Sequence, residues 1–309
     1  MLRYFLRRLL QIIPVFIGAT FLVYFLVFAL PGDPIANLFG DRQPSPAVIN
    51  SLREQYNLDK PFIIQYLLFL RNILTFNLGP DFTGRPIAEI LAQVYPVTAQ
   101  LAIMALVIET IFGIFFGLIA GLRKGKFFDA TALVASLFVI AVPTFVIGFV
   151  LQLVIGLQLG WVRPTVGPNP TFSSLLLPAI VLAAGSFAYI LRLTRASVSE
   201  GMNEDYVRTA TAKGLSRPRV VTVHVLRNSL IPVVTFIGAD IGNLMGGAIV
   251  TEGIFNISGV GQKLYASILN GQGATVVSIV AVLVLVFVIA NLVVDLLYAV
   301  LDPRIRYVK

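Results

Sequence analysis

Apolar runs of about twenty residues recur along this 309-residue chain, and they constrain its fold more than any other feature. A helix needs about 20 apolar residues to cross a hydrocarbon core about 30 Å thick. Only 12% of the residues are charged, whereas a soluble domain carries about 25%. The sequence therefore predicts an all-α polytopic membrane protein rather than a water-soluble fold.

Six transmembrane spans are expected: Leu9–Leu30, Val97–Leu122, Ala130–Trp161, Leu175–Leu193, Leu230–Thr251 and Val276–Leu301. The first follows three arginines, as a secretory signal would. It is too long for the apolar part of such a signal and lacks a small-residue cleavage site, so we interpret it as a retained span. Residues 31–96 mix Pro, Asn and Asp with short apolar stretches. A structureless loop of that length is improbable, so we expect a small folded cap against the membrane.

The predicted organisation follows from these spans. It comprises a tail with the first span (1–30), an extracytoplasmic cap loop (31–96), a core of five spans (97–301) containing a cytoplasmic loop (195–229), and a cytoplasmic tail (302–309). Most of the 23 Lys and Arg residues fall on the side that holds both termini. The positive-inside rule then places both termini in the cytoplasm. The net charge of +8 is thus a topology signal rather than a nucleic-acid-binding surface.

The cytoplasmic loop carries the most informative motif. Residues 205–215 read DYVRTATAKGL, and residues 224–232 read HVLRNSLIP. A stripe recurs every four residues and would share one face of a continuous helix; its members are Val198, Met202, Tyr206, Ala210 and Gly214. Gly214 can stop a helix with positive φ, and Ser216 with Pro218 favours a new start. Such a helix can lie in a groove of a partner protein, or the loop can simply be solvated.

Two acids, Glu109 and Asp240, fall near the middle of predicted spans. Burying charge there is costly, so intramembrane acids are candidates for function. Asn243 lies one turn after Asp240, and the three are candidate lining residues of a hydrated path; a structural role for the acids is the alternative. Glycines recur every fourth position at 113, 117 and 121, and again at 238, 242 and 246. They favour close helix packing, within this chain or against a second subunit.

Enzymatic chemistry finds no support in the sequence. The chain has no cysteine, and His224 is its one histidine, without partners spaced for a metal site. The segment Gly121–Phe127 comes closest to a phosphate-binding loop. Its glycine spacing is one residue short, and Phe127 stands where Ser or Thr would hold Mg²⁺. We expect no catalytic residue, metal or cofactor on this chain.

Taken in order, the motifs resemble the permeases of ABC importers, especially the dipeptide/oligopeptide family. The resemblance covers nearly the whole chain. It rests on the 205–232 loop and on Arg3-Tyr4, Arg7–Leu9, Pro31–Pro34, Leu58–Pro61, Gly246–Ala248, Glu252, Ile254-Phe255, Gly259–Gly261 and Leu301–Tyr307. Two departures are Arg208, where the general loop motif has Glu, and Asn270–Gly273, where members commonly carry an acid.

This resemblance implies a type I (MetI-like) importer fold with a large extracytoplasmic loop, in the plasma membrane of a prokaryote. The implied partners are a second permease subunit, two ATPase domains that bind ATP and Mg²⁺, and an extracytoplasmic peptide-binding protein. ATPase docking would use Asp205, Tyr206, Arg208, Thr209, Ala210, Ala212, Lys213, Gly214 and Leu215. Contact with the binding protein would use Ile254, Phe255, Gly259, Gly261 and Lys263.

Alternatives remain for the cargo and for the energy source. Di- or oligopeptides are the favoured cargo, but nickel and glutathione permeases look similar, because selectivity largely resides in the binding protein. A different class is a proton-coupled secondary transporter that uses Glu109 and Asp240. Uptake driven by a pH gradient without any ATPase would favour it. A channel-like structural protein would leave the 205–232 loop without a purpose.

Overall fold

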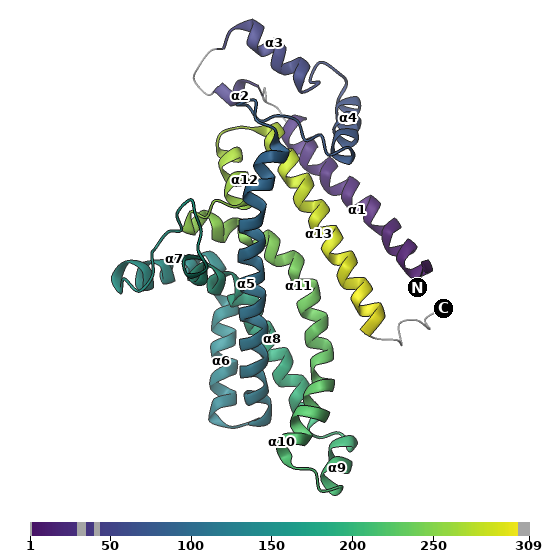
Figure 1. Ribbon diagram of the computed structural model, residues 1–309, viewed down its shortest axis with the longest axis vertical. Coiled ribbons are helices and arrows are strands. Elements are labelled where there is room, and N and C mark those ends of the chain that lie inside the picture. Colours follow the sequence, from purple (N-terminus) through teal and green to yellow (C-terminus); the bar gives the residue numbers. More distant parts are fainter. Residues whose placement is uncertain (1, 30–34, 40–43, 302–309) are drawn as a thin grey trace. The chain divides into compact units, whose positions relative to one another are not determined.

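The computed structural model describes residues 2–29, 35–39 and 44–301, and their regular structure is almost entirely helical (Figure 1). The Pro31–Pro34 motif and the predicted tail 302–309 lie outside the described residues. The chain divides into two compact units. Unit 1 contains residues 1–98 and 258–309, and unit 2 contains residues 99–257.

Unit 1 is built around helices α1 (Leu2–Phe28) and α13 (Gly273–Leu301), which pack against each other. The segment predicted to form a cap holds α2 (Ala36–Phe39), α3 (Pro46–Gln55) and α4 (Phe62–Leu74). Helix α4 packs on α1 through an aromatic cluster in which the Tyr66 ring lies 5.1 Å from Phe21 and 5.7 Å from Tyr24. The Tyr66 hydroxyl donates to the carbonyl of Ile17 at 2.8 Å. The described residues of this segment therefore form packed helices.

A short turn between α4 and α5 is organised by one buried carboxylate. Asp81 accepts hydrogen bonds from the Thr83 hydroxyl at 2.6 Å and from the backbone N–H groups of Thr83 and Arg85. Lys263, on α12 (Val260–Leu269), lies 3.9 Å from the same carboxylate. Burial of Asp81 opposes ionisation, but these hydrogen bonds and the Lys263 charge together lower its pKa. The turn is thus tied to the segment that precedes α13.

Unit 2 contains most of α5 (Ile87–Leu122), then α6 (Phe127–Ala141), α7 (Thr144–Leu151), the π-helical segment η1 (Gln152–Gln158) and α8 (Phe172–Gly201). A loop with α9 (Asp205–Ala212), α10 (Arg217–Arg219) and π-helical η2 (Val220–Val225) leads into α11 (Leu226–Phe255). Helices α8 and α11 share the most extensive helix contact in the unit. Helix α8 is also the most buried of the candidate spans.

The α5 glycines allow that helix to approach α8 closely. A Cβ atom on Gly117 would lie 2.6 Å from both the Leu191 carbonyl oxygen and Thr194 Cβ. A Cβ on Gly113 would lie 2.6 Å from Ile190 Cγ2, and one on Gly121 would lie 2.9 Å from the Arg195 carbonyl oxygen. This glycine stripe therefore serves packing within the chain, one of the two interpretations drawn from the sequence.

Five helices are long and apolar enough to cross a membrane, and a sixth span forms if α6 and α7–η1 are counted as one. The predicted span Ala130–Trp161 is the one that departs from expectation. The helix expected there breaks at Pro143, and its two parts are bent by 101°. Val142 is extended because it precedes Pro143, and Pro143 is the N-cap residue of α7.

Candidate functional site

The predicted docking helix, α9, lies in a compact bend of the chain between α8 and α11. This bend, residues 202–225, is called the elbow. Helix α9 ends in two hydrogen bonds, from Gly214 N–H to the Thr211 carbonyl at 2.9 Å and from Leu215 N–H to the Ala210 carbonyl at 3.3 Å. This is a Schellman motif, which needs a left-handed residue, and Gly214 supplies it with φ +77°. Pro218 opens the next helix, as expected. The predicted stop and restart are confirmed.

The stripe predicted from the sequence shares one face only if the helix is continuous, and this helix is interrupted. The stripe from Val198 to Gly214 does not lie on one continuous helix, because α8 ends at Gly201 and α9 begins at Asp205. Because of this break, α9 folds back against the end of α8. Val198 and Ala210 are buried in one hydrophobic cluster, and Met202 and Tyr206 pack against it. These members of the stripe therefore hold α9 in place, rather than presenting a surface to a partner.

Helix α9 is anchored to both helices that flank it. The cluster also contains Val207 on α9 with Val220 and Val225 on η2. The Ser229 hydroxyl donates to the Ser197 carbonyl at 3.0 Å and so joins α11 to α8. Gly201 sits in this junction, since a Cβ there would lie 3.0 Å from Tyr206 Oη and 3.1 Å from Ser229 Oγ. The elbow is thus connected rigidly to α8 and α11.

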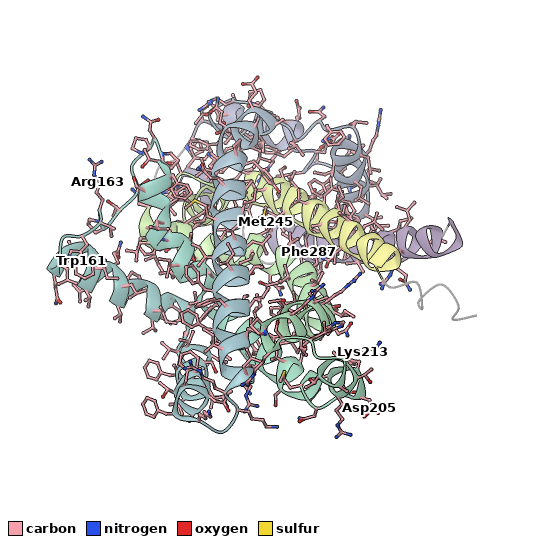
Figure 2. All side chains as sticks on the ribbon, turned by 60° about the horizontal axis from the view of Figure 1, so that its bottom comes forward. Trp161, Arg163, Asp205, Lys213, Met245 and Phe287 are labelled. Carbon is pink, nitrogen blue, oxygen red and sulfur yellow. The ribbon has the colours of Figure 1, made fainter. Side chains whose placement is uncertain are left out.

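The opposite face of the elbow is polar and exposed. Asp205 and Lys213 lie at the ends of α9 (Figure 2), and both are exposed. Arg208 pairs with Asp205 at 3.3 Å, but with side-chain exposures of 78% and 94% this ion pair adds little stability. The exposed members of the predicted docking set are Asp205, Arg208, Thr209, Ala212, Lys213 and Gly214; Ala210 is buried, and Tyr206 and Leu215 are half-buried.

A buried ion pair that the sequence interpretation did not identify lies at the base of α8. Arg195 Nε and Nη2 donate to the two carboxylate oxygens of Asp129 at 2.8 and 2.7 Å. The Gly125 N–H also donates to Asp129 at 2.8 Å. This arrangement fastens the α5–α6 turn to α8, six residues before α8 ends. Neither residue is assigned a role from the sequence, although an acid and a base near the ends of two spans are candidates to pair.

The two acids within the spans lie together and away from solvent. Glu109 on α5 and Asp240 on α11 are buried, and their carboxyl groups are close enough to interact directly. Asn243 Nδ2 lies 3.4 Å from Asp240 Oδ1. No other hydrogen-bond partner of the Glu109 carboxyl is found within the described part of the chain. In this conformation neither acid lines an open path.

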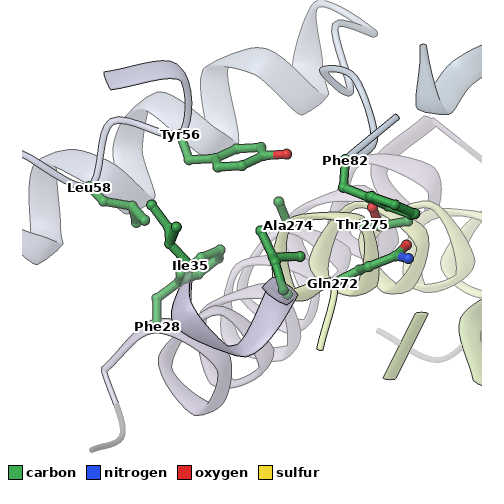
Figure 3. Close-up of a pocket in the computed structure, with 10 residues that line it drawn as sticks. Phe28, Ile35, Tyr56, Leu58, Phe82, Gln272, Ala274 and Thr275 are labelled. Atoms are coloured by element: carbon green, nitrogen blue, oxygen red, sulfur yellow. The ribbon is translucent and has the colours of Figure 1, made fainter. Parts of the chain in front are cut away.

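Asn243 does line an open groove. About 290 Å³ of space lies between α7, α8 and α11, bordered by Thr144, Phe145, Leu182, Gly185, Ser186, Asn243, Leu244 and Val250. The polar groups around it are neutral hydroxyls and an amide. The pocket of unit 1 drawn in Figure 3 holds about 10 Å³, which is room for one water molecule at most. Two other pockets of unit 1 hold about 90 and about 260 Å³. The groove is a candidate for a cargo path because Asn243, a predicted lining residue, borders it.

The predicted binding-protein contacts are mostly inaccessible. Phe255, Gly259 and Gly261 are buried, and Ile254 is half-buried. The Ile254 carbonyl accepts a hydrogen bond from the Gln152 amide at 3.0 Å, and the Phe255 carbonyl accepts one from Val166 N–H at 2.8 Å. Lys263 pairs with Asp81. The exposed large hydrophobic side chains of α12 are instead Tyr265, Ile268 and Leu269. The described residues contain no cluster suited to a metal ion.

Comparison with known proteins gives a match along almost the whole chain. Residues 113–307 match the family described as binding-protein-dependent transport system inner membrane component. Residues 1–102 match the N-terminal family of such membrane components.

Individual relatives are similar over their full length. The chain is 34% identical to a dipeptide transport system permease protein of Alkalihalophilus pseudofirmus, across 99% of this chain and 100% of that protein. It is 36% identical to the dipeptide transport system permease protein of Escherichia coli K12, across 100% of both chains. A glutathione transport system permease protein of Pectobacterium atrosepticum is 38% identical, across 99% of this chain and 100% of that protein.

Proposed function

Because the chain belongs to the family of binding-protein-dependent transport system inner membrane components, we propose that it forms part of the path of a short peptide through the membrane and takes up mechanical work at α9. Proteins of this family are multi-pass membrane subunits without catalytic activity, and ATP hydrolysis is carried out by separate ATPases. We propose as partners a second permease subunit, two ATPase domains that bind ATP and Mg²⁺, and an extracytoplasmic binding protein.

The construction of the elbow carries this proposal. Its inner face is fixed to α8 and α11, and its outer face leaves Asp205, Arg208 and Lys213 free to meet another protein. A helix that docks in a groove needs this combination of a fixed base and an unpartnered face. Movement of an ATPase that holds α9 would then be transmitted to two membrane spans at once. Nucleotide binding would shift the permease between two conformations through its different affinity for each.

The groove beside Asn243 is proposed to carry the cargo. Its lining has no charged side chain, so it does not hold one terminus of a peptide strongly. This property suits cargo with varied side chains, where the binding protein sets the selectivity. The relatives include dipeptide and glutathione permeases at similar identity, and glutathione is itself a short peptide. We therefore propose short peptides as the cargo class.

The proposed orientation follows the basic residues. The α9 elbow, the α5–α6 turn and both termini would face the cytoplasm, and the cap and α12 would face outward. The exposed α12 side chains Tyr265, Ile268 and Leu269 would then contribute more contact to the binding protein than the buried Gly259 and Gly261. Proton-driven transport is the weaker alternative, because Glu109 and Asp240 are both buried and do not face the groove.

Site-directed cross-linking tests the docking proposal directly. The chain has no cysteine, so Ala212→Cys introduces a single reactive thiol on the exposed face of α9. We expect a bifunctional reagent to join it to an ATPase subunit in the assembled transporter, with a yield that changes when ATP is bound. Arg163→Cys, exposed in the loop after η1 and on the proposed outer side, is the control and should not react with that subunit. Equal yields from the two positions would contradict the proposal.

A further inference from the structure

The turn between α5 and α6 concentrates positive charge without a counter-charge. Arg123, Lys124 and Lys126 are all exposed on this turn. None of the three forms a salt bridge in the part of the chain that the structure describes. Lys124 lies near Asp129, but Arg195 and the Gly125 N–H already occupy both oxygens of that carboxylate. The turn therefore presents three cations whose charge is not neutralised by the protein.

An apolar surface begins where the cations end. Phe127, the first residue of α6, is 87% exposed. Thr131, Val134 and Phe138 follow on the same face of the helix at spacings of four, three and four residues, and all are exposed. Water would not be a favourable surrounding for this face, whereas lipid chains would. Cations thus lie directly beside a lipid-facing stripe at the end of a membrane helix.

The shape of the turn is fixed. Gly125 has φ +77°, and its N–H is held by Asp129, which Arg195 holds in turn. The Arg123 carbonyl accepts a hydrogen bond from Lys126 N–H at 2.9 Å, which closes the turn. The backbone that carries the cations is therefore ordered before any ligand arrives, so binding costs less conformational entropy.

We propose that this turn is a binding site for the headgroup of an anionic phospholipid, whose acyl chains lie along Phe127, Val134 and Phe138. The phosphate and the additional negative charge of a headgroup such as phosphatidylglycerol complement Arg123, Lys124 and Lys126. Basic residues beside membrane spans are attracted to anionic leaflets at about 1 kcal/mol each. The proposal goes beyond transport itself and does not depend on which partner moves α9.

The single tryptophan of the chain allows a direct test. Trp161→Phe combined with Phe127→Trp gives one fluorescent reporter in the proposed site, and Trp161 in the native chain reports from the loop after η1 (Figure 2). Both proteins are placed in vesicles that contain brominated phosphatidylglycerol or brominated phosphatidylcholine. We expect brominated phosphatidylglycerol to quench the reporter at position 127 at a lipid fraction at least about fivefold lower than brominated phosphatidylcholine needs. The reason is that each cation contributes about a factor of five in affinity. Trp161, beside the single cation Arg163, should show a smaller preference.

Charge-reversing substitutions provide a second test of the lipid site. Lys124→Glu with Lys126→Glu in the reporter background should remove the preference, whereas Arg163→Glu, an exposed cation elsewhere in unit 2, should leave it unchanged. Equal quenching by both lipids, or a preference that survives the double reversal, would overturn the proposal. Protection of Lys124 from amine labelling only in the assembled transporter, together with equal quenching, would assign the turn to a protein subunit instead. If the reporter variant does not fold, retention of phosphatidylglycerol by wild type and by Lys124→Gln with Lys126→Gln, measured by native mass spectrometry, decides the question.

Discussion

At the scale of single residues, burial decides what a charge contributes. Asp205–Arg208 and Asp129–Arg195 are both pairs of an aspartate with an arginine. The first is almost fully exposed with one contact at 3.3 Å, and the second has two contacts below 3 Å with a nearly buried carboxylate. Sequence spacing alone indicates the first pair, which is local. The second joins residues 66 positions apart, so only the folded chain brings it together.

Close packing at Gly117 gives the first prediction. Gly117→Ala places a methyl group 2.6 Å from the Leu191 carbonyl oxygen and from Thr194 Cβ, atoms that cannot move without shifting α8. We expect the substitution to destabilise the chain by about 1–3 kcal/mol, measured as a lower thermal unfolding temperature in detergent. Gly18→Ala, with nothing within 4 Å of the new methyl group, is the control. An equal effect at both positions would argue against close α5–α8 packing.

The depressed pKa of Asp81 gives a prediction about pH. A carboxyl group whose pKa is lower when folded than when unfolded stabilises the fold above its unfolded pKa, which is about 4. That stabilisation is lost as the pH falls through the lower, folded pKa. Acid should therefore weaken the contact between the turn and α12. Hydrogen exchange of the Thr83 and Arg85 amides, followed from about pH 6 down to about pH 3, measures this. Asp81→Asn should remove most of the pH dependence; an unchanged profile in that variant would contradict it.

At the scale of elements, the elbow shows which local features a sequence specifies. Gly214, Ser216 and Pro218 predict where helices end and begin, because caps depend on adjacent residues. Whether α8 continues into α9 depends on the fold around it: Val198, Val207 and Val225 can be buried together only if the chain turns after Gly201. Tertiary packing therefore decides which face of the loop is available to a partner.

The left-handed conformation of Gly214 is predicted to be necessary for transport. Gly214→Val forces a β-branched side chain into φ +77°, at a cost of about 1–2 kcal/mol, and should distort the end of α9. We expect peptide uptake to fall severely while membrane insertion is retained. Gly214→Asn is the matched variant, because Asn tolerates this conformation, and it should keep substantial uptake. Uptake is measured with radiolabelled dipeptide in cells; equal loss in both variants would implicate size rather than conformation.

The buried ion pair at the base of α8 is predicted to stabilise unit 2. Asp129→Asn or Arg195→Gln leaves a buried group without its partner and should cost about 3 kcal/mol. The double substitution Asp129→Asn with Arg195→Gln should cost less than the sum of the two. Thermal unfolding of all four proteins completes the cycle. Arg208→Gln, which breaks only the exposed pair, should not change the unfolding temperature. Additive effects would mean that the two side chains do not interact.

At the scale of the whole molecule, hydropathy predicted most of the spans. Five spans appear close to their expected positions because an apolar run of the right length has few alternatives in a membrane. The break between α6 and α7 could not be predicted, because Pro143 is compatible with a kink as well as with a break. The bent arrangement is held by contacts with residues distant in the sequence: the Gln152 amide donates hydrogen bonds to the carbonyls of Pro164 and Ile254.

The topology is the prediction at this scale. In a chain without native cysteine, Lys126→Cys and Lys213→Cys should react with a membrane-impermeant maleimide only from the cytoplasmic side. Lys60→Cys and Arg163→Cys should react only from outside. The reason is the excess of basic residues on the side of the α9 elbow. Labelling of intact cells compared with inverted vesicles measures this, and uptake by each variant confirms that it is folded. Reaction of Lys213→Cys in intact cells would reverse the assigned orientation.

The right-angled break after α6 has a consequence for the surrounding bilayer. The 15 residues of α6 rise by at most about 22 Å, less than a hydrocarbon core of about 30 Å. Since α7 and η1 turn by 101°, they add almost no depth if α6 stands along the membrane normal. A span this short is expected to make the neighbouring phospholipids shorten or splay. The short α6 thus creates a hydrophobic mismatch with the bilayer, and we expect the activity of the protein to depend on the acyl-chain length of the surrounding lipids.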